Sequence, residues 1–281
     1  MPNLPAEAKG MGMFAGGFDL GSGRYGVDWI MRDRAGRACS SHWELQAKLG
    51  PHERTMALAL GENAIAEGLA NGSDEKPASS RVASQGLHLK ILLNLSPVGE
   101  KESLLDPRYA HVLVSMLRSI VHESDLQRVS LIAFNLRAQK VVYRMENADA
   151  VDFSALGKVF EHPDAGAIDY RLLQDQKAEA HFVTNLLIDQ LGRRASREDA
   201  IVILGPKVTL ERRVSLGLLK RGGVASCPIF YLNYTPNPFE EPFPDTIGSA
   251  LKAYSTAWRF QIVEPHDFGA AMKEMLVRLG R

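Results

Sequence analysis

The stretch that most constrains the fold runs from Leu87 to Pro97, almost continuously apolar until it ends in small polar residues and a proline. A run this short, rich in Leu and Ile, is typical of a strand buried on both faces at the centre of a parallel sheet. Open α/β folds place their ligands at the carboxyl ends of such strands. We therefore expect Asn94 and Ser96, which end the run, to lie at a ligand-binding edge.

The composition is that of an ordinary globular chain. Of the 281 residues, 45% are hydrophobic and 23% charged, enough for one large core or two modest ones. Lys plus Arg and Asp plus Glu both total 33, so no net charge attracts nucleic acid or an anionic membrane. No apolar run is long enough to span a membrane, and the start lacks the features of a signal peptide. We expect a soluble chain without an export signal, although a truncated start of an exported protein would look the same, so the compartment stays open.

The two cysteines, Cys39 and Cys227, lie far apart and have no neighbours at zinc-site spacing. Two buried thiols are the first interpretation, because free cysteine is among the most buried residue types. One bridge between the two parts of the chain is the alternative.

The first seventy residues predict a small β unit, complete or part of a larger one. Up to about residue 17 no periodicity is visible, which indicates a loop. From about 25 to 49 polar and apolar residues alternate on both sides of a Gly-containing turn at 33–37, which predicts a β-hairpin. Trp29 and Trp43 fall on its apolar faces, where both could pack against a common core. Residues 56–60 are a candidate third strand.

Within this unit, Gly21 to Gly26 matches the G-x-G-x-x-G dinucleotide fingerprint. That motif binds a pyrophosphate only where a helix follows the glycines. Here a strand follows, so we interpret the segment as a turn and expect no nucleotide cofactor.

Residues 71–86 have the composition of a linker, and residues 87–281 predict a second, α/β domain. Short apolar runs alternate with amphipathic segments, and a joint of a few residues near 137–139 forces two strands to be antiparallel. The prediction is a doubly wound, mostly parallel six-stranded sheet with one antiparallel edge strand and about six helices. The expected strands are 87–97, 129–136, 140–145, 200–204, 228–234 and 258–263. The expected helices are 106–120, 152–161, 177–191, 216–221, 246–255 and a last helix that contains residues 271–279.

This order of elements resembles the von Willebrand factor A domain over roughly residues 87–280. The family's sheet has five parallel strands and one antiparallel edge strand reached by a tight hairpin. Its metal-ion-dependent adhesion site uses D-x-S-x-S after the first strand, a Thr loop, and an Asp after the fourth strand. The resemblance implies a Rossmann-like fold and an adhesion-type domain that binds another protein through oxygen ligands on Mg²⁺ or Mn²⁺.

The metal motif departs from the family at each position. The first segment reads Asn94-Leu-Ser96-Pro-Val98, with Asn for Asp and Val for the second Ser. The loop 166–170 has no Thr, although Asp169 could supply a carboxylate, and the fourth strand ends in Gly-Pro-Lys207 instead of Asp-Gly. Without two of its aspartates a divalent cation would lose most of its compensating charge. We therefore expect a degenerate adhesion site without metal or other cofactor.

A metal-free surface at the same edge is our binding hypothesis. Lys207 would take the cation position, with Asn94, Ser96 and Asp169 as hydrogen-bond partners, and would attract an acidic group; the alternative is that it points into solvent. The Pro-rich loop after residue 233 adds three aromatic candidates for anchors, or for packing onto the same domain: Tyr234, Phe239 and Phe243.

Enzymatic motifs are absent from the sequence. It contains no G-x-S-x-G elbow and no Walker A segment, and its histidines have no metal spacing. Ser96 follows a strand, but Pro97 after it has no amide hydrogen for an oxyanion hole. The sequence thus predicts a non-enzymatic protein–protein interaction domain. The alternatives are a small-molecule enzyme in the same crevice and a scaffold that docks the N-terminal β unit.

Overall fold

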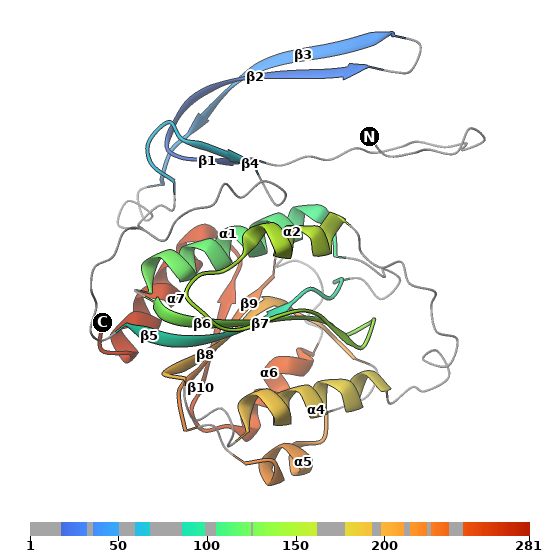
Figure 1. Ribbon diagram of the computed structural model, residues 1–281, viewed down its shortest axis with the longest axis vertical. Coiled ribbons are helices and arrows are strands. Elements are labelled where there is room, and N and C mark those ends of the chain that lie inside the picture. The colour runs from blue at the N-terminus through green and yellow to red at the C-terminus, as the bar shows by residue number, and fades with distance from the viewer. Residues whose placement is uncertain are drawn as a thin grey trace, which may run out of the picture.

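The computed structural model describes residues 18–32, 36–50, 60–67, 86–98, 105–124, 126–161, 178–192, 198–210, 214–223, 226–235 and 244–281. The predicted fold class is confirmed within this part of the chain. A six-stranded α/β sheet lies between helices, and two small antiparallel sheets precede it in the sequence (Figure 1). Of the predicted linker 71–86, only Gly86 falls within the described residues.

The main sheet has the central strand and the antiparallel edge that the sequence predicts. Its order is β10 (Ala257–Ile262), β9 (Ile229–Tyr234), β8 (Ala200–Pro206), β5 (Leu87–Asn94), β6 (Leu126–Asn135) and β7 (Lys140–Ala148). All neighbours are parallel except β6 and β7. The four residues between β6 and β7 form a turn, in which Asn135 Oδ1 accepts a hydrogen bond from the Ala138 amide. So short a turn makes β7 antiparallel.

Helices cover both faces of the sheet (Figure 1). On one face lie α1 (Pro107–Glu123), α2 (Phe153–Glu161) and α7 (Pro265–Arg278). On the other lie α4 (Ala178–Leu191), α5 (Leu216–Arg221) and α6 (Thr246–Ala250), which continues into the 3-10 turn η1 (Leu251–Ala253). Two apolar cores fill the spaces between the sheet and these layers. No helix among the described residues combines the length and the apolar character that crossing a membrane requires.

The described N-terminal segments form two short ribbons. The predicted hairpin is confirmed as β2 (Gly23–Arg32) paired with β3 (Ala38–Ala47). A second pair, β1 (Phe18–Leu20) with β4 (Ile65–Glu67), was not predicted, because three residues are too few to show a period of two. Of the candidate third strand at 56–60, residues 56–59 lie outside the described residues.

Three expectations about burial were wrong. Trp29 and Trp43 lie on one face of the hairpin but remain 43% and 44% exposed, because no core in the described part of the chain covers them. Cys39 is exposed while Cys227 is buried, and both thiols are free, so neither two buried thiols nor a bridge is found. The central strand β5 is only partly buried on one face, where His88 and Lys90 reach the surface.

An ionic cluster joins β1 to α1. The Asp19 carboxylate accepts hydrogen bonds from the Arg118 guanidinium at 2.6 Å and from the Ser115 hydroxyl at 2.9 Å, and it contacts the His111 ring at 2.8 Å. These side chains are mostly buried. Arg118 also lies over the Phe153 ring, 5.1 Å from its centroid. The cluster therefore fixes the β1–β4 ribbon to the helical layer.

We expect Asp19→Asn to loosen this attachment without unfolding the main sheet. The amide keeps the shape but loses the charge that faces Arg118, and a hydrogen bond to a charged group contributes about 1.5–3 kcal/mol. Hydrogen exchange of the Gly21 and Asn63 amides, which donate across the β1–β4 ribbon, should accelerate at least about tenfold. Asp28→Asn, which removes an exposed carboxylate beside His42, is the control. Equal exchange in both variants would show that the cluster does not hold the ribbon.

Candidate functional site

Asn94 and Ser96 form a closed hydrogen-bond network at the carboxyl end of β5. The Asn94 side-chain oxygen accepts from the Ser96 amide at 3.1 Å and from the Ser96 hydroxyl at 2.5 Å. The Asn94 side-chain amide donates to the Pro206 carbonyl of β8 at 3.2 Å. The Ser96 hydroxyl accepts from the Leu136 amide, just past β6, at 2.8 Å. Both residues are 0% exposed, so the network ties together the ends of three neighbouring strands.

The network uses the oxygens that a metal site would need. A hard cation requires several oxygen ligands free to coordinate it, whereas the Asn94 oxygen already accepts two hydrogen bonds. Gly205 at the end of β8 closes the space further, because a Cβ there would stand 2.5 Å from Asn94 Cβ and 2.6 Å from its backbone oxygen. In this conformation neither the Asn94 nor the Ser96 side chain is exposed to a binding partner. Their role in the binding hypothesis is therefore to hold the strand ends together.

Among the described residues, the carboxylate that Lys207 influences is Asp245. Its positive charge lies near Asp245 and lowers the pKa of that carboxyl, although burial outweighs this effect and leaves the pKa raised. Asp245 caps α6 by accepting from the Gly248 amide at 3.0 Å, and also accepts from the Tyr231 hydroxyl and the Asn233 side-chain amide. Sequence reasoning missed Asp245; an Asp just before a predicted helix is the cap signal that could have found it.

The predicted aromatic anchors are placed only in part. The Tyr234 ring packs edge-on against Tyr109, with 6.1 Å between centroids, and partial burial raises the pKa of its hydroxyl. Tyr234 therefore packs onto its own domain. Asp169, Phe239 and Phe243 lie outside the described residues, so their part in the hypothesis stays a prediction.

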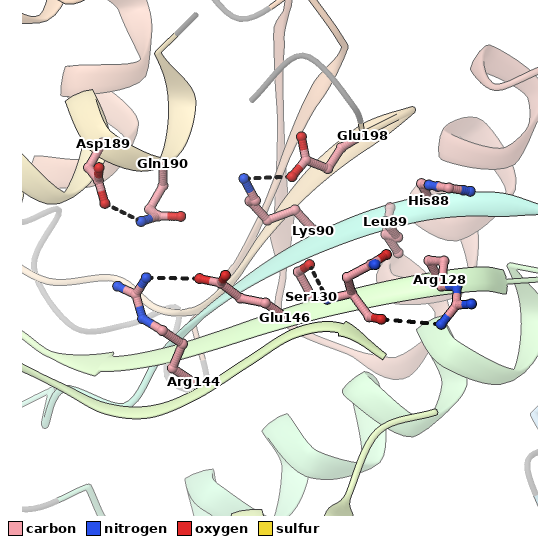
Figure 2. Close-up of a pocket in the computed structure, with 11 residues that line it drawn as sticks. His88, Leu89, Lys90, Arg128, Ser130, Arg144, Glu146, Asp189, Gln190 and Glu198 are labelled. Carbon is pink, nitrogen blue, oxygen red and sulfur yellow. Dashed lines mark hydrogen bonds and ion pairs between the residues drawn. The ribbon is translucent and has the colours of Figure 1, made fainter. Parts of the chain in front are cut away.

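A polar hollow lies at the opposite end of the central strand. It measures about 720 Å³ and lies over the amino-terminal halves of β5 and β6, next to the end of α4 (Figure 2). Three adjacent strands each contribute two polar residues spaced i, i+2, which puts both on the same face. The pairs are His88 and Lys90, Arg128 and Ser130, and Arg144 and Glu146. The i, i+2 spacing of polar residues in these strands is the sequence signal that could have indicated the hollow.

Within the described part of the chain, no group of three or more His, Cys, Asp and Glu side chains is arranged to hold a metal ion. We therefore expect Mg²⁺, Mn²⁺ and Ca²⁺ at millimolar concentration to leave the melting temperature at its value in EDTA. A ligand that binds only the folded state must raise that temperature by mass action. A clear rise that Ser96→Ala abolishes would show that the network opens to admit a cation.

Asp245 makes a pH dependence testable. Because burial raises its pKa in the folded state, its contribution to stability is fully present below the unfolded pKa and is lost as the pH rises through the folded one. The unfolding free energy of the wild type should therefore decrease relative to Asp245→Asn as the pH rises above the ordinary aspartate pKa of about 4, by at most about 1.4 kcal/mol per pH unit. Urea titrations at several pH values test this. A constant difference would show that Asp245 titrates as in the unfolded chain.

Comparison with protein-family models and with curated proteins found no match to this chain. Among solved structures, the chain is similar to one described as the crystal structure of azoreductase AzrA, with 10% sequence identity and a TM-score of 0.27. The match covers 68% of this chain and 98% of that one. A likeness this low carries no functional argument, so the function is argued from the geometry above.

Proposed function

We propose that the chain is a non-enzymatic, metal-independent protein-binding domain. The observation that carries the proposal is the uncovered apolar face of the β2–β3 ribbon, which projects away from the α/β body (Figure 1). Surface patches of this kind mark interaction sites in soluble proteins. The proposal moves the main contact away from the carboxyl edge, because Asn94 and Ser96 are buried there.

The ribbon is amphipathic by register. Val27 pairs with Trp43, Trp29 with Ser41 and Tyr25 with Leu45, so these side chains share one face. Five large apolar side chains of the ribbon are exposed: Trp29, Ile30, Met31, Trp43 and Leu45. All of them except Ile30 lie on that face, and the opposite face carries polar residues, including the ion pair between Asp28 and His42 at 2.7 Å. A partner that covers the apolar face would bury two tryptophans, the residue type most enriched in binding hot spots.

A second copy of the chain does not fit this face as well as a different protein does. Two ten-residue strands side by side present a face of roughly 300 Å². Ribbon-to-ribbon packing would therefore bury roughly 600–700 Å², less than the approximately 1,000 Å² that a specific interface needs. The geometry favours a partner with a broader apolar surface that also contacts the ribbon's rim.

The contacts between the N-terminal segments and the α/β domain also support a scaffold role for that domain, which is one of the two alternatives left open by the sequence. The Asp19 cluster attaches the β1–β4 ribbon to α1, and Tyr25 of β2 donates a hydrogen bond to the Gly21 carbonyl at 2.8 Å. The sheet with five parallel strands and one antiparallel edge agrees with the von Willebrand A resemblance. In this proposal the domain holds the ribbon in place, and the ribbon binds.

The test starts from a photo-crosslinking amino acid placed at position 43 or, as a control on the polar face, at position 44. We expect a discrete covalent adduct from position 43 only. The partner protein captured in the adduct is then purified by itself, and its affinity for the chain is measured by calorimetry. Trp29→Ser with Trp43→Ser should weaken binding at least about thirtyfold, because even one hot-spot tryptophan contributes about 2 kcal/mol or more.

Ile30→Ser is the matched control, since Ile30 is exposed and apolar but lies on the opposite face of the ribbon. Its affinity should stay within about threefold of wild type, because neutral contacts change binding little. Equal losses in the two variants, or wild-type affinity in the double-Trp variant, would contradict the assignment of this face.

A further inference from the structure

The hollow beside β5 contains charges where an α/β fold usually buries apolar side chains. Lys90 and Glu198 are only 12% and 16% exposed, and Gln190 is 5% exposed. Charged side chains are rarely buried over a central strand, because removing them from water is costly unless each is paired. Figure 2 shows Asp189 and Gln190 on one side of the hollow and the Lys90–Glu198 pair on the other.

The cations that line the hollow are each neutralised by a carboxylate. Lys90 contacts Glu198 at 2.7 Å and Arg144 contacts Glu146 at 3.0 Å. Arg128 pairs with Asp149 at 2.5 Å. These three pairs leave no excess positive charge on the walls.

Asp189 differs from the other charged groups. Its carboxylate accepts a hydrogen bond at 2.5 Å from the Gln190 side-chain amide, a neutral group. Within the described part of the chain it has no ion-pair partner. Asp189 is also in the last turn of α4, which contains no basic residue, and the carboxyl end of a helix carries a partial negative charge. Among the described residues, no cation therefore pairs with the negative charge at this side of the hollow.

Glu198 adds a second acceptor without a donor. Its Oε1 faces Lys90, but its Oε2 is buried and has no hydrogen-bond partner among the described residues. A buried carboxylate oxygen without a donor is costly. Asp189 thus has no positively charged hydrogen-bond donor among the described residues, and Glu198 has one on only one of its two carboxylate oxygens.

We propose that this hollow binds an organic cation through an ammonium or guanidinium group, with Asp189 as its counter-ion and Glu198 as a second acceptor. A guanidinium offers several N–H donors in one plane and can bridge two acceptors. The volume of about 720 Å³ falls in the range of small-molecule sites, so it admits the carbon chain that carries the charge. The ammonium or guanidinium group can belong to a free small molecule or to a Lys or Arg side chain of another protein. This inference does not depend on the proposed role of the ribbon.

The experiment titrates the full chain with four probes at constant ionic strength, followed by backbone amide chemical shifts. Butylguanidinium is compared with its neutral analogue butylurea, and the peptide acetyl-Gly-Arg-Gly-amide with acetyl-Gly-Gln-Gly-amide. We expect the cationic probes to shift the amides of Asp189 and Gln190 with millimolar affinity or better, and the neutral probes not to shift them. Stronger binding of butylguanidinium indicates a free small-molecule cation as the natural ligand, and stronger binding of the peptide indicates a basic side chain.

Asp189→Asn tests the counter-ion at an exposed position where the fold should not change. We expect its affinity for the cationic probes to decrease at least tenfold. Glu274→Gln on α7, which removes the same charge from an exposed pair with Arg278, should bind as wild type does. Absence of binding by either cationic probe, equal binding of the neutral analogues, or equal losses in both variants would overturn the proposal.

Discussion

The burial of β5 between two helical layers is the constraint on which the rest of the structure depends. Leu92 and Ile91 point to opposite cores and both are fully buried. Each such side chain contributes about 1.5–3 kcal/mol when it leaves water. A strand whose second half, residues 91–94, is buried on both faces cannot lie at an edge, so β6 and β8 must pair with it and helices must cover both sides. The parallel order and the two layers follow from this one segment.

The carboxyl end of β5 satisfies its polar groups through protein hydrogen bonds. Parallel strands that end together bring several polar groups into one place, and those groups must be satisfied. Here Asn94 and Ser96 satisfy one another and the ends of β6 and β8. An aspartate at position 94 would lack the amide that donates to Pro206. The asparagine at position 94 therefore suits a neutral hydrogen-bond network.

Local patterns predicted the fold better than the site, for a physical reason. The hairpin, the helices and the central strand each repeat a period within a few residues, so their signals are contained in the sequence itself. Asn94 bonds Pro206 and Ser96 bonds Leu136, both far away in the chain, and no local pattern reports these contacts. The exposure of Trp29 and Trp43 is likewise non-local, because it depends on whether another element covers the face. His88 and Lys90 did carry a local signal, but six apolar neighbours concealed it.

The two ends of β5 differ in what they leave unsatisfied, and this difference favours one end as a ligand site. At the carboxyl end the side chain of Asn94 has protein partners for both its oxygen and its amide. At the amino end Lys90 holds only one oxygen of Glu198, and the other has no donor among the described residues. A ligand gains most where it replaces hydrogen bonds that the protein does not make for itself, because the cost of desolvating those groups has already been met in the free protein. The usual rule that α/β sheets bind at their carboxyl edge assumes that this edge is open. In the described part of the chain the hydrogen-bond network occupies the polar side chains at the carboxyl end of β5, and a polar hollow lies at the other end of the same strand.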